Sequence, residues 1–138
     1  MSLHACVNFP RQDSEIERSL DWCPPLPNCV STEASTFFHH IKSFELAMPL
    51  KEAWPLIRES VSELPNTSIT HESEGYIYAK SYSAVFHFLD YFEVLSIKNE
   101  NHLSVRSSSL LGLSDFFINY FRSEKFRTSL LSKDVIHQ

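Results

Sequence analysis

Two cysteines frame a proline-rich stretch, CPPLPNC at residues 23–29, and the chemistry of their thiols decides what this stretch could do. A zinc site usually has cysteines about two to four residues apart and a second cysteine pair elsewhere, and this chain has only three cysteines. A nucleophilic thiol would need a nearby base that lowers its pKa. We therefore interpret Cys23 and Cys29 as small buried side chains that pin the segment against the core, with a disulfide as the alternative.

The prolines between the cysteines give this segment its expected role. Proline fixes the backbone in an extended form at low entropic cost, and Asn28 can bond backbone groups where proline offers no donor. We predict a rigid structural segment laid against the sheet, built on Cys23, Pro27, Asn28 and Cys29.

Charged residues lie in two stretches that otherwise have the apolar character of strands, 85–98 and 102–109. Asp90, Glu93 and Arg106 must be paired or functional there, because burying an isolated charge costs several kcal/mol. Asp90 and Glu93 are three residues apart and should point to opposite faces of the sheet, which argues against a general acid–base pair.

The turn between these two stretches allows two registers. A three-residue loop at 99–101 pairs Glu93 with Ser107 and matches the apolar residues of the two strands. A two-residue loop at 99–100 pairs Glu93 with Arg106, but it requires a positive φ at Glu100. We favour the first register.

The histidines do not form a ligand set. His39 and His40 are adjacent and would point to opposite faces of a strand, so they cannot share one ion. The others in the predicted strands, His71, His87 and His102, are isolated. We predict no metal site and no cofactor.

The elements that must position these residues indicate an α+β fold with a single antiparallel sheet of four to five strands and two helices on one face. Short links force neighbouring strands to be antiparallel. Apolar residues three and four apart predict a helix at 48–64, effectively starting near Ala53 because of Pro55. A second helix is predicted at 114–132, with Ser114 as N-cap and Asp115 in its first turn. The expected strands are 36–46, 67–72, 76–83, 85–98 and 102–109.

Bulk properties exclude some functions. The 138 residues suit one domain, which we place at 22–138 behind an irregular N-terminal arm at 1–21. A net charge of −5 does not favour nucleic acid. No stretch reaches the roughly 18–20 apolar residues of a membrane span, and no secretory signal begins the chain, so we expect a soluble, cytoplasmic protein on these grounds.

Three motifs in order, CPPLPNCVS at 23–31, FHFLDYFEV at 86–94 and VRSSSLLGLSDFFINYFR at 105–122, resemble the bacterial and plastid family of unknown function numbered 1499. The likeness spans about residues 22–131. This resemblance implies a fold and a set of important residues, but it implies no reaction. It also adds the cell envelope or an organelle as alternative locations for the protein. The implied residues are Cys23, Pro27, Asn28, Cys29, Ser31, Asp90, Glu93, Arg106, Ser107, Ser109, Gly112, Ser114, Asp115, Asn119 and Arg122.

The chain departs from the family pattern at four positions. Tyr91 replaces an acid, Leu110 and Tyr120 replace arginines, and Phe117 replaces the glycine of the last motif. An anion-binding or catalytic site built from the lost charges would be weakened or altered here.

The polar residues of these motifs have two interpretations. They could bind an anion or a polar head group where strand ends meet the start of the last helix, or they could hold the fold together as a hydrogen-bonded network. The candidate ligand-binding cluster is Asp90, Glu93, Arg106, Ser114, Asp115, Asn119 and Arg122.

Aromatic residues are abundant, with eleven phenylalanines. On the last helix we expect Phe117, Tyr120, Phe121, Phe126 and Leu130 to be buried, with Arg122, Lys125 and Arg127 facing water. The further aromatic residues are Phe86, Phe88, Phe92 and Phe116. Together these are many large side chains for one core, so the alternative to full burial is a cavity lined by aromatic residues or an exposed aromatic patch.

We predict an uncharacterised, non-catalytic domain that binds a partner protein or an apolar or amphiphilic ligand with its aromatic surface beside the polar cluster. The alternatives are a small hydrolase-like enzyme with a carboxylate and arginine site, or a polar cluster that is purely structural.

Overall fold

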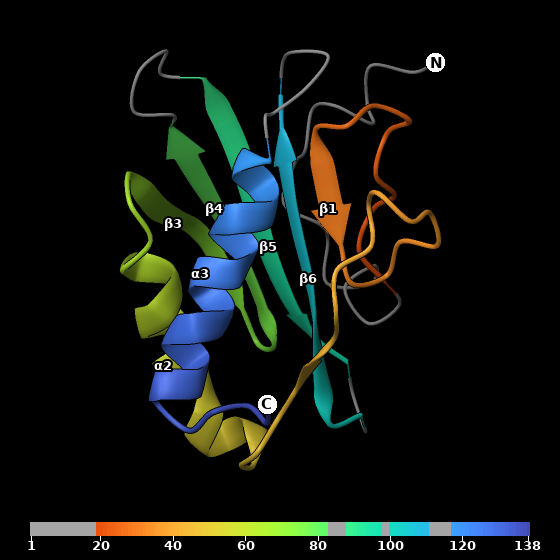
Figure 1. Cartoon of the computed structure of the whole chain (residues 1–138). Coiled ribbons are helices and arrows are strands. Elements are labelled where there is room, and N and C mark those ends of the chain that lie inside the picture. The colour runs from red at the N-terminus through yellow and green to blue at the C-terminus, as the bar shows by residue number, and fades with distance from the viewer. Residues whose placement is uncertain (1–18, 83–87, 98–99, 111–116) are drawn as a thin grey trace.

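The described chain has two strands, a helix, four strands and a second helix in order, which is an α+β fold and confirms the predicted class (Figure 1). The computed structural model describes residues 19–82, 88–97, 100–110 and 117–138. Within these ranges the elements are β1 (Cys29–Ser31), β2 (Phe44–Glu45), α2 (Leu50–Ser62), β3 (Thr67–Ser73), β4 (Tyr76–Tyr82), β5 (Leu89–Ser96), β6 (His102–Ser109) and α3 (Ile118–Ser132).

The described strands form one six-stranded antiparallel sheet in the order β1-β6-β5-β4-β3, with β2 also paired to β6. Both helices lie in front of the same face of this sheet (Figure 1). On that face Phe92 and Val94 pack with Ile57 of α2 and Phe126 of α3. The opposite face carries a smaller cluster of Leu20, Tyr76, Tyr78, Tyr91 and Leu95. The sheet therefore separates two buried layers.

The first helix lies within the predicted range 48–64 but begins before the predicted effective start near Ala53. Ala53, Ile57 and Val61 form its buried stripe, as the apolar spacing indicates. The helix starts at Leu50 and not near Ala53, although Pro55 lies inside it. The backbone N–H of Ala53 already donates to the carbonyl of Pro49 (3.0 Å), so a complete helical turn precedes Pro55.

No helix in the described part of the chain has the length and apolar character to cross a membrane.

The last helix begins later than predicted. Its N-cap residue is Phe117, in the left-handed conformation (φ 68°) and without a side-chain cap, so the predicted start with Ser114 as N-cap is wrong. Ser114 and Asp115 themselves lie outside the described residues. A left-handed residue interrupts the helical path, and it costs about 1–2 kcal/mol for an L-amino acid with a side chain.

The predicted strand at 36–46 is wrong over most of its length, because only Phe44–Glu45 pairs as β2. The preceding residues form a turn in which the N–H groups of His39 and His40 both donate to the carbonyl of Thr36 (3.1 and 3.0 Å). The other strand predictions agree with β3, β4 and β6, and with β5 within its described part.

The favoured register between β5 and β6 is also wrong. Glu93 lies opposite Arg106, and Val94 lies opposite Val105, which is the alternative pairing. The N–H of Glu100 donates to the carbonyl of Ile97 (3.0 Å) in the connection, of which residues 98–99 lie outside the described ranges. The pairing of two opposite charges decides the register, because neither charge can be buried alone.

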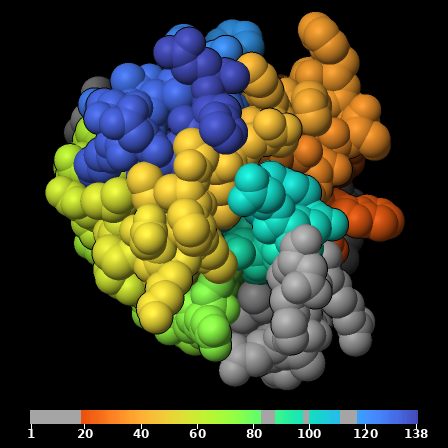
Figure 2. Space-filling model, turned by 90° about the horizontal axis from the view of Figure 1, so that it is seen from below, coloured from red at the N-terminus to blue at the C-terminus, as the bar shows by residue number. Residues whose placement is uncertain are grey.

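The C-terminal residues after α3 form backbone hydrogen bonds with β2 and with the segment between β2 and α2, on the side of the molecule opposite the start of α3 (Figure 1). The N–H of Ala47 donates to the carbonyl of Val135 (2.8 Å), and the N–H of His137 donates to that of Glu45 (2.9 Å). Seen from below, the blue C-terminal residues lie beside the yellow segment that leads into α2 (Figure 2).

The turn between β3 and β4 generates a test of backbone geometry. Gly75 has a φ of 78°, and a Cβ placed there would meet Ser96 only at ordinary contact distances. Gly75→Ala should therefore lower the free energy of unfolding by about 1 kcal/mol through backbone strain alone. Urea unfolding would measure this loss. Glu74→Ala in the same turn is the control, and equal losses in both variants would contradict the explanation.

Candidate functional site

The predicted polar cluster is divided by the sheet into two groups. Asp90, Asn119 and Arg122 lie on the helix face, whereas Glu93 and Arg106 lie on the opposite face. Asp90 and Glu93 thus point to opposite faces, as predicted. Whether any of these residues binds a ligand stays a prediction, and Ser114 and Asp115 lie outside the described residues.

On the helix face a guanidinium joins the helix to two strands. Arg122 donates from Nη2 to Asp90 Oδ2 (2.6 Å), and from Nη1 to Ser107 Oγ (3.0 Å) and Asn119 Oδ1 (2.8 Å). The side chains of Arg122 and Asp90 are both nearly buried. Charge-assisted hydrogen bonds of this length are the stronger kind, so they offset much of the cost of burial.

Asn119 extends this helix-face network to the start of β1. Its Nδ2 donates to the carbonyl of Asn28 (3.1 Å) and to Ser109 Oγ (2.9 Å), while its Oδ1 also accepts from Ser107 Oγ (2.7 Å). The N–H of Ser109 donates to the same carbonyl of Asn28 (2.8 Å). The first turn of α3 is therefore bound to the segment before β1 through polar groups.

On the opposite face a second guanidinium is buried. Arg106 and Glu93 have side-chain exposures of 1% and 2%, and Arg106 Nη1 lies 3.3 Å from Glu93 Oε1. Tyr76 Oη donates to Glu93 Oε2 (2.6 Å), and Arg106 also donates to Ser108 Oγ (3.1 Å). Its Nη2 donates to the carbonyl of Trp22 (3.1 Å). This network binds the other end of the proline-rich segment.

The proline-rich segment, residues 22–29, is held at both ends and closed by a disulfide between Cys23 and Cys29, with the two Cα atoms 5.5 Å apart. The alternative interpretation of these cysteines is therefore the one found, and two separate packed thiols are not. His39 fixes its middle, since Nε2 donates to the carbonyl of Leu26 (2.9 Å) and Nδ1 accepts from Thr36 Oγ1 (2.6 Å).

Burial changes the pKa of several groups. Desolvation raises the pKa of Tyr78, with the charges of Tyr91 and Glu93 adding to the effect. Desolvation also raises the pKa of Tyr91. On the surface, hydrogen bonding to Arg58 lowers the pKa of Glu72.

No group of three or more His, Cys, Asp or Glu residues within the described ranges is placed to hold a metal ion.

A groove of about 440 Å³ lies between the start of α3 and the turn before β2. We call it the aromatic groove. Phe117 and Tyr120 line it from α3, Phe37 and Phe38 line it from the turn, and apolar residues line it from the segment around β1. Its described lining residues are Pro27, Cys29, Val30, Phe37, Phe38, His40, Phe117 and Tyr120.

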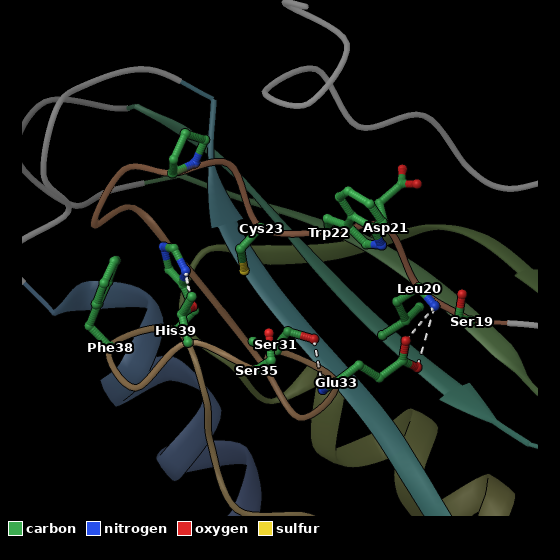
Figure 3. Close-up of a pocket in the computed structure, with 13 residues that line it drawn as sticks. Ser19, Leu20, Asp21, Trp22, Cys23, Ser31, Glu33, Ser35, Phe38 and His39 are labelled. Carbon is green, nitrogen blue, oxygen red and sulfur yellow. Dashed lines mark hydrogen bonds between the residues drawn. The ribbon is translucent and has the colours of Figure 1, made fainter. Parts of the chain in front are cut away.

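A second cavity of about 740 Å³, which we call the arm cleft, lies between residues 19–25 and 31–39 (Figure 3). Both oxygens of the Glu33 carboxylate accept from the N–H of Leu20 (3.1 and 3.3 Å), and Ser31 Oγ accepts from the N–H of Glu33. Trp22 and Asp21 lie at one end of the drawn cleft and Phe38 at the other.

The start of α3 is oriented differently from the prediction. Phe126 and Leu130 are buried as expected, but Phe117, Tyr120 and Phe121 are exposed and Arg122 is nearly buried. The inner face of the first turns carries Asn119 and Ser123. Sequence analysis also did not single out Trp22, Phe37 or Phe38, which lie in segments without a regular apolar period.

The buried pair on the sheet generates a stability test. Arg106→Ala should lower the free energy of unfolding by about 3–5 kcal/mol, because Glu93 would be left buried without its cation. The double change Arg106→Met with Glu93→Leu should recover most of this loss in urea unfolding. Arg58→Ala, which breaks an exposed ion pair with Glu72, is the control and should cost at most about 1 kcal/mol. Equal losses for Arg58→Ala and Arg106→Ala would contradict the assignment.

The buried tyrosines generate a pH test. Because the folded-state pKa of Tyr78 lies above its ordinary value of 10.0, the folded protein keeps this proton longer than the unfolded chain does. This stabilisation is complete below about pH 10 and is lost as the pH rises further. Tyr78→Phe should flatten the fall in stability above about pH 10, measured by urea unfolding at a series of pH values. Tyr82→Phe, at an exposed position, is the control, and an unchanged slope in Tyr78→Phe would refute the effect.

Comparison with models of protein families gives a match over most of the chain. A family model described as a protein of unknown function (DUF1499) matches residues 19–130, which include the proline-rich segment, the sheet and most of α3. No curated protein matches the chain.

Proposed function

The chain belongs to the protein family of unknown function DUF1499, and from its own surface we propose that it is a non-catalytic binding domain for an amphiphilic ligand. In this proposal the aromatic groove holds the apolar part of the ligand. The polar networks on the two faces of the sheet position the walls of the groove.

The orientation of α3 carries this proposal. Its first turns present polar side chains to the sheet and apolar side chains to water, the reverse of an ordinary surface helix. Phe117 is 71% and Phe121 63% exposed, whereas Asn119 is completely buried. A contiguous exposed apolar patch on a protein surface is typical of a ligand or partner site. Across the groove Phe37, at 96% exposure, extends the same patch.

The conformation of Phe117 supports a role for its ring. This residue has a positive φ, where glycine would be free of strain. The family pattern that the chain resembles has glycine here. Strained backbone is found mainly at functional sites, where another requirement offsets its cost. We infer that the ring is retained for binding.

The composition and rigidity of the groove also favour a small apolar ligand. Ligand sites are commonly cavities of about 300–1,000 Å³ with mainly apolar walls and a few polar groups. Among the described lining residues, the polar groups are the ring of His40 and the hydroxyl of Tyr120, and the rest of the lining is apolar. One wall is closed by the Cys23–Cys29 disulfide and the other is fixed through His39. Walls that are already ordered reduce the entropic cost of binding.

The contacts of the carboxylates do not favour a hydrolase. Asp90 and Glu93 each accept hydrogen bonds from an arginine, are nearly buried and lie on opposite faces of the sheet. A general acid and base would need to approach one substrate bond together.

Replacing the strained aromatic residue tests the proposal with two effects of opposite sign. Phe117→Gly should raise the free energy of unfolding by about 1 kcal/mol, because the left-handed strain is removed. It should also weaken binding of decyl maltoside, a neutral amphiphile, by about tenfold, because one wall of the groove is lost. For the unchanged protein we expect a Kd on the order of 10–100 µM, measured by calorimetry below the micelle concentration.

Tyr82→Ser is the matched control for this experiment, since Tyr82 is an exposed aromatic residue that lines neither cavity. It should leave the Kd for decyl maltoside unchanged within about twofold. The proposal fails if the unchanged protein does not bind the probe, or if Phe117→Gly and Tyr82→Ser bind it equally well.

A further inference from the structure

We infer that the head group of this ligand is cationic, an ammonium group that occupies the arm cleft while the tail occupies the aromatic groove. This inference rests on the proposed function and adds the chemical class of the ligand.

The two cavities share one lining aromatic residue. Phe38 lines both the arm cleft and the aromatic groove, and the same proline-rich segment borders them, through Cys23 and Pro25 on one side and Pro27 and Cys29 on the other. A molecule that lies along the ring of Phe38 therefore reaches both cavities. An amphiphile has the required form, with an apolar tail and a polar end.

The charges of the arm cleft select the sign of that polar end. Among the residues that the structure describes, its lining is Ser19, Leu20, Asp21, Trp22, Cys23, Pro25, Ser31, Glu33, Ala34, Ser35, Thr36, Phe38 and His39, and none of these is a lysine or an arginine. Glu33 contributes negative charge. His39 is engaged at both ring nitrogens, so neither nitrogen is available to an anion. Charge complementarity therefore favours a cation.

The carboxylate of Glu33 is already oriented. It accepts from the N–H of Leu20, while its own N–H donates to Ser31 Oγ (3.1 Å). The carboxylate still borders the open cleft, since it is an exposed residue in a lining position. A fixed negative charge loses little conformational freedom when a cation binds, which increases its contribution.

Trp22 supplies the second recognition element. Trp22 lines the cleft and is 88% exposed to solvent, although its main chain is held by Arg106 through the carbonyl oxygen. The face of an indole ring attracts ammonium groups, and quaternary ammonium ligands are commonly recognised by aromatic side chains together with acids. An exposed tryptophan and a carboxylate that line the same cleft, with Phe38 at its other end, match this chemistry (Figure 3).

Three probes with the same ten-carbon tail test the inference: decyltrimethylammonium, decyl maltoside and decyl sulfate, each titrated by calorimetry below its micelle concentration. We expect the ammonium probe to bind about tenfold more tightly than the maltoside, and the sulfate more weakly than both. The preference should decrease at high salt, because the cleft is open to solvent.

Variants separate the cleft from the overall negative charge of the protein. Glu33→Gln retains an oxygen that can accept from Leu20 and should weaken ammonium binding about fivefold without changing maltoside binding. Trp22→Leu should weaken it by a similar factor. Glu45→Gln removes an exposed charge that lines neither cavity and should change nothing.

The outcomes distinguish the two proposals. Equal binding of all three probes, tighter binding of the sulfate, or equal effects of Glu33→Gln and Glu45→Gln would overturn the cationic head group and leave the apolar groove intact. Failure of every probe to bind would overturn the proposed function as well.

Discussion

The burial of two arginine side chains against opposite faces of one sheet, Arg106 from β6 and Arg122 from α3, is the constraint on which the rest of the structure depends. A guanidinium can leave water only if its donors meet acceptors, and Arg106 and Arg122 find them on opposite faces. Arg106 requires Glu93 opposite it, which sets the register of β5 and β6. It also requires the carbonyl of Trp22, which holds the proline-rich segment against the sheet. One buried charge thus fixes a strand pairing and the position of a segment more than eighty residues away.

The second arginine determines which side of α3 faces water. Because Arg122 and Asn119 must reach Asp90, Ser107 and the carbonyl of Asn28, the polar side of the first turns faces the sheet. The aromatic residues between them are then necessarily on the outer side of the helix. The apolar surface of the aromatic groove is therefore a consequence of the buried polar network and does not arise from poor packing.

The sequence predicts those parts of the fold that local patterns specify, and it misses those that distant contacts decide. Alternation and the turn at Gly75 specify β3 and β4, and a simple apolar spacing specifies α2. The predicted register of β5 and β6 is wrong because it matches the apolar residues Leu95 and Val105, whereas the fold pairs Glu93 with Arg106. The predicted orientation of α3 is wrong because its polar side is buried by hydrogen bonds of Asn119 and Arg122 with Ser107 and Ser109 of β6. The sequence of the helix alone does not reveal these distant partners. Trp22 and Phe37 were missed because irregular segments have no period from which exposure can be inferred.

The proline-rich segment connects the two networks across the edge of the sheet. At one end the carbonyl of Trp22 accepts from Arg106, and at the other the carbonyl of Asn28 accepts from Asn119. The disulfide holds these two ends at a fixed separation. The same short segment borders both the arm cleft and the aromatic groove. The relative position of the two cavities is therefore set by the contacts that hold the fold together, so a ligand that spans them meets walls that are already in place.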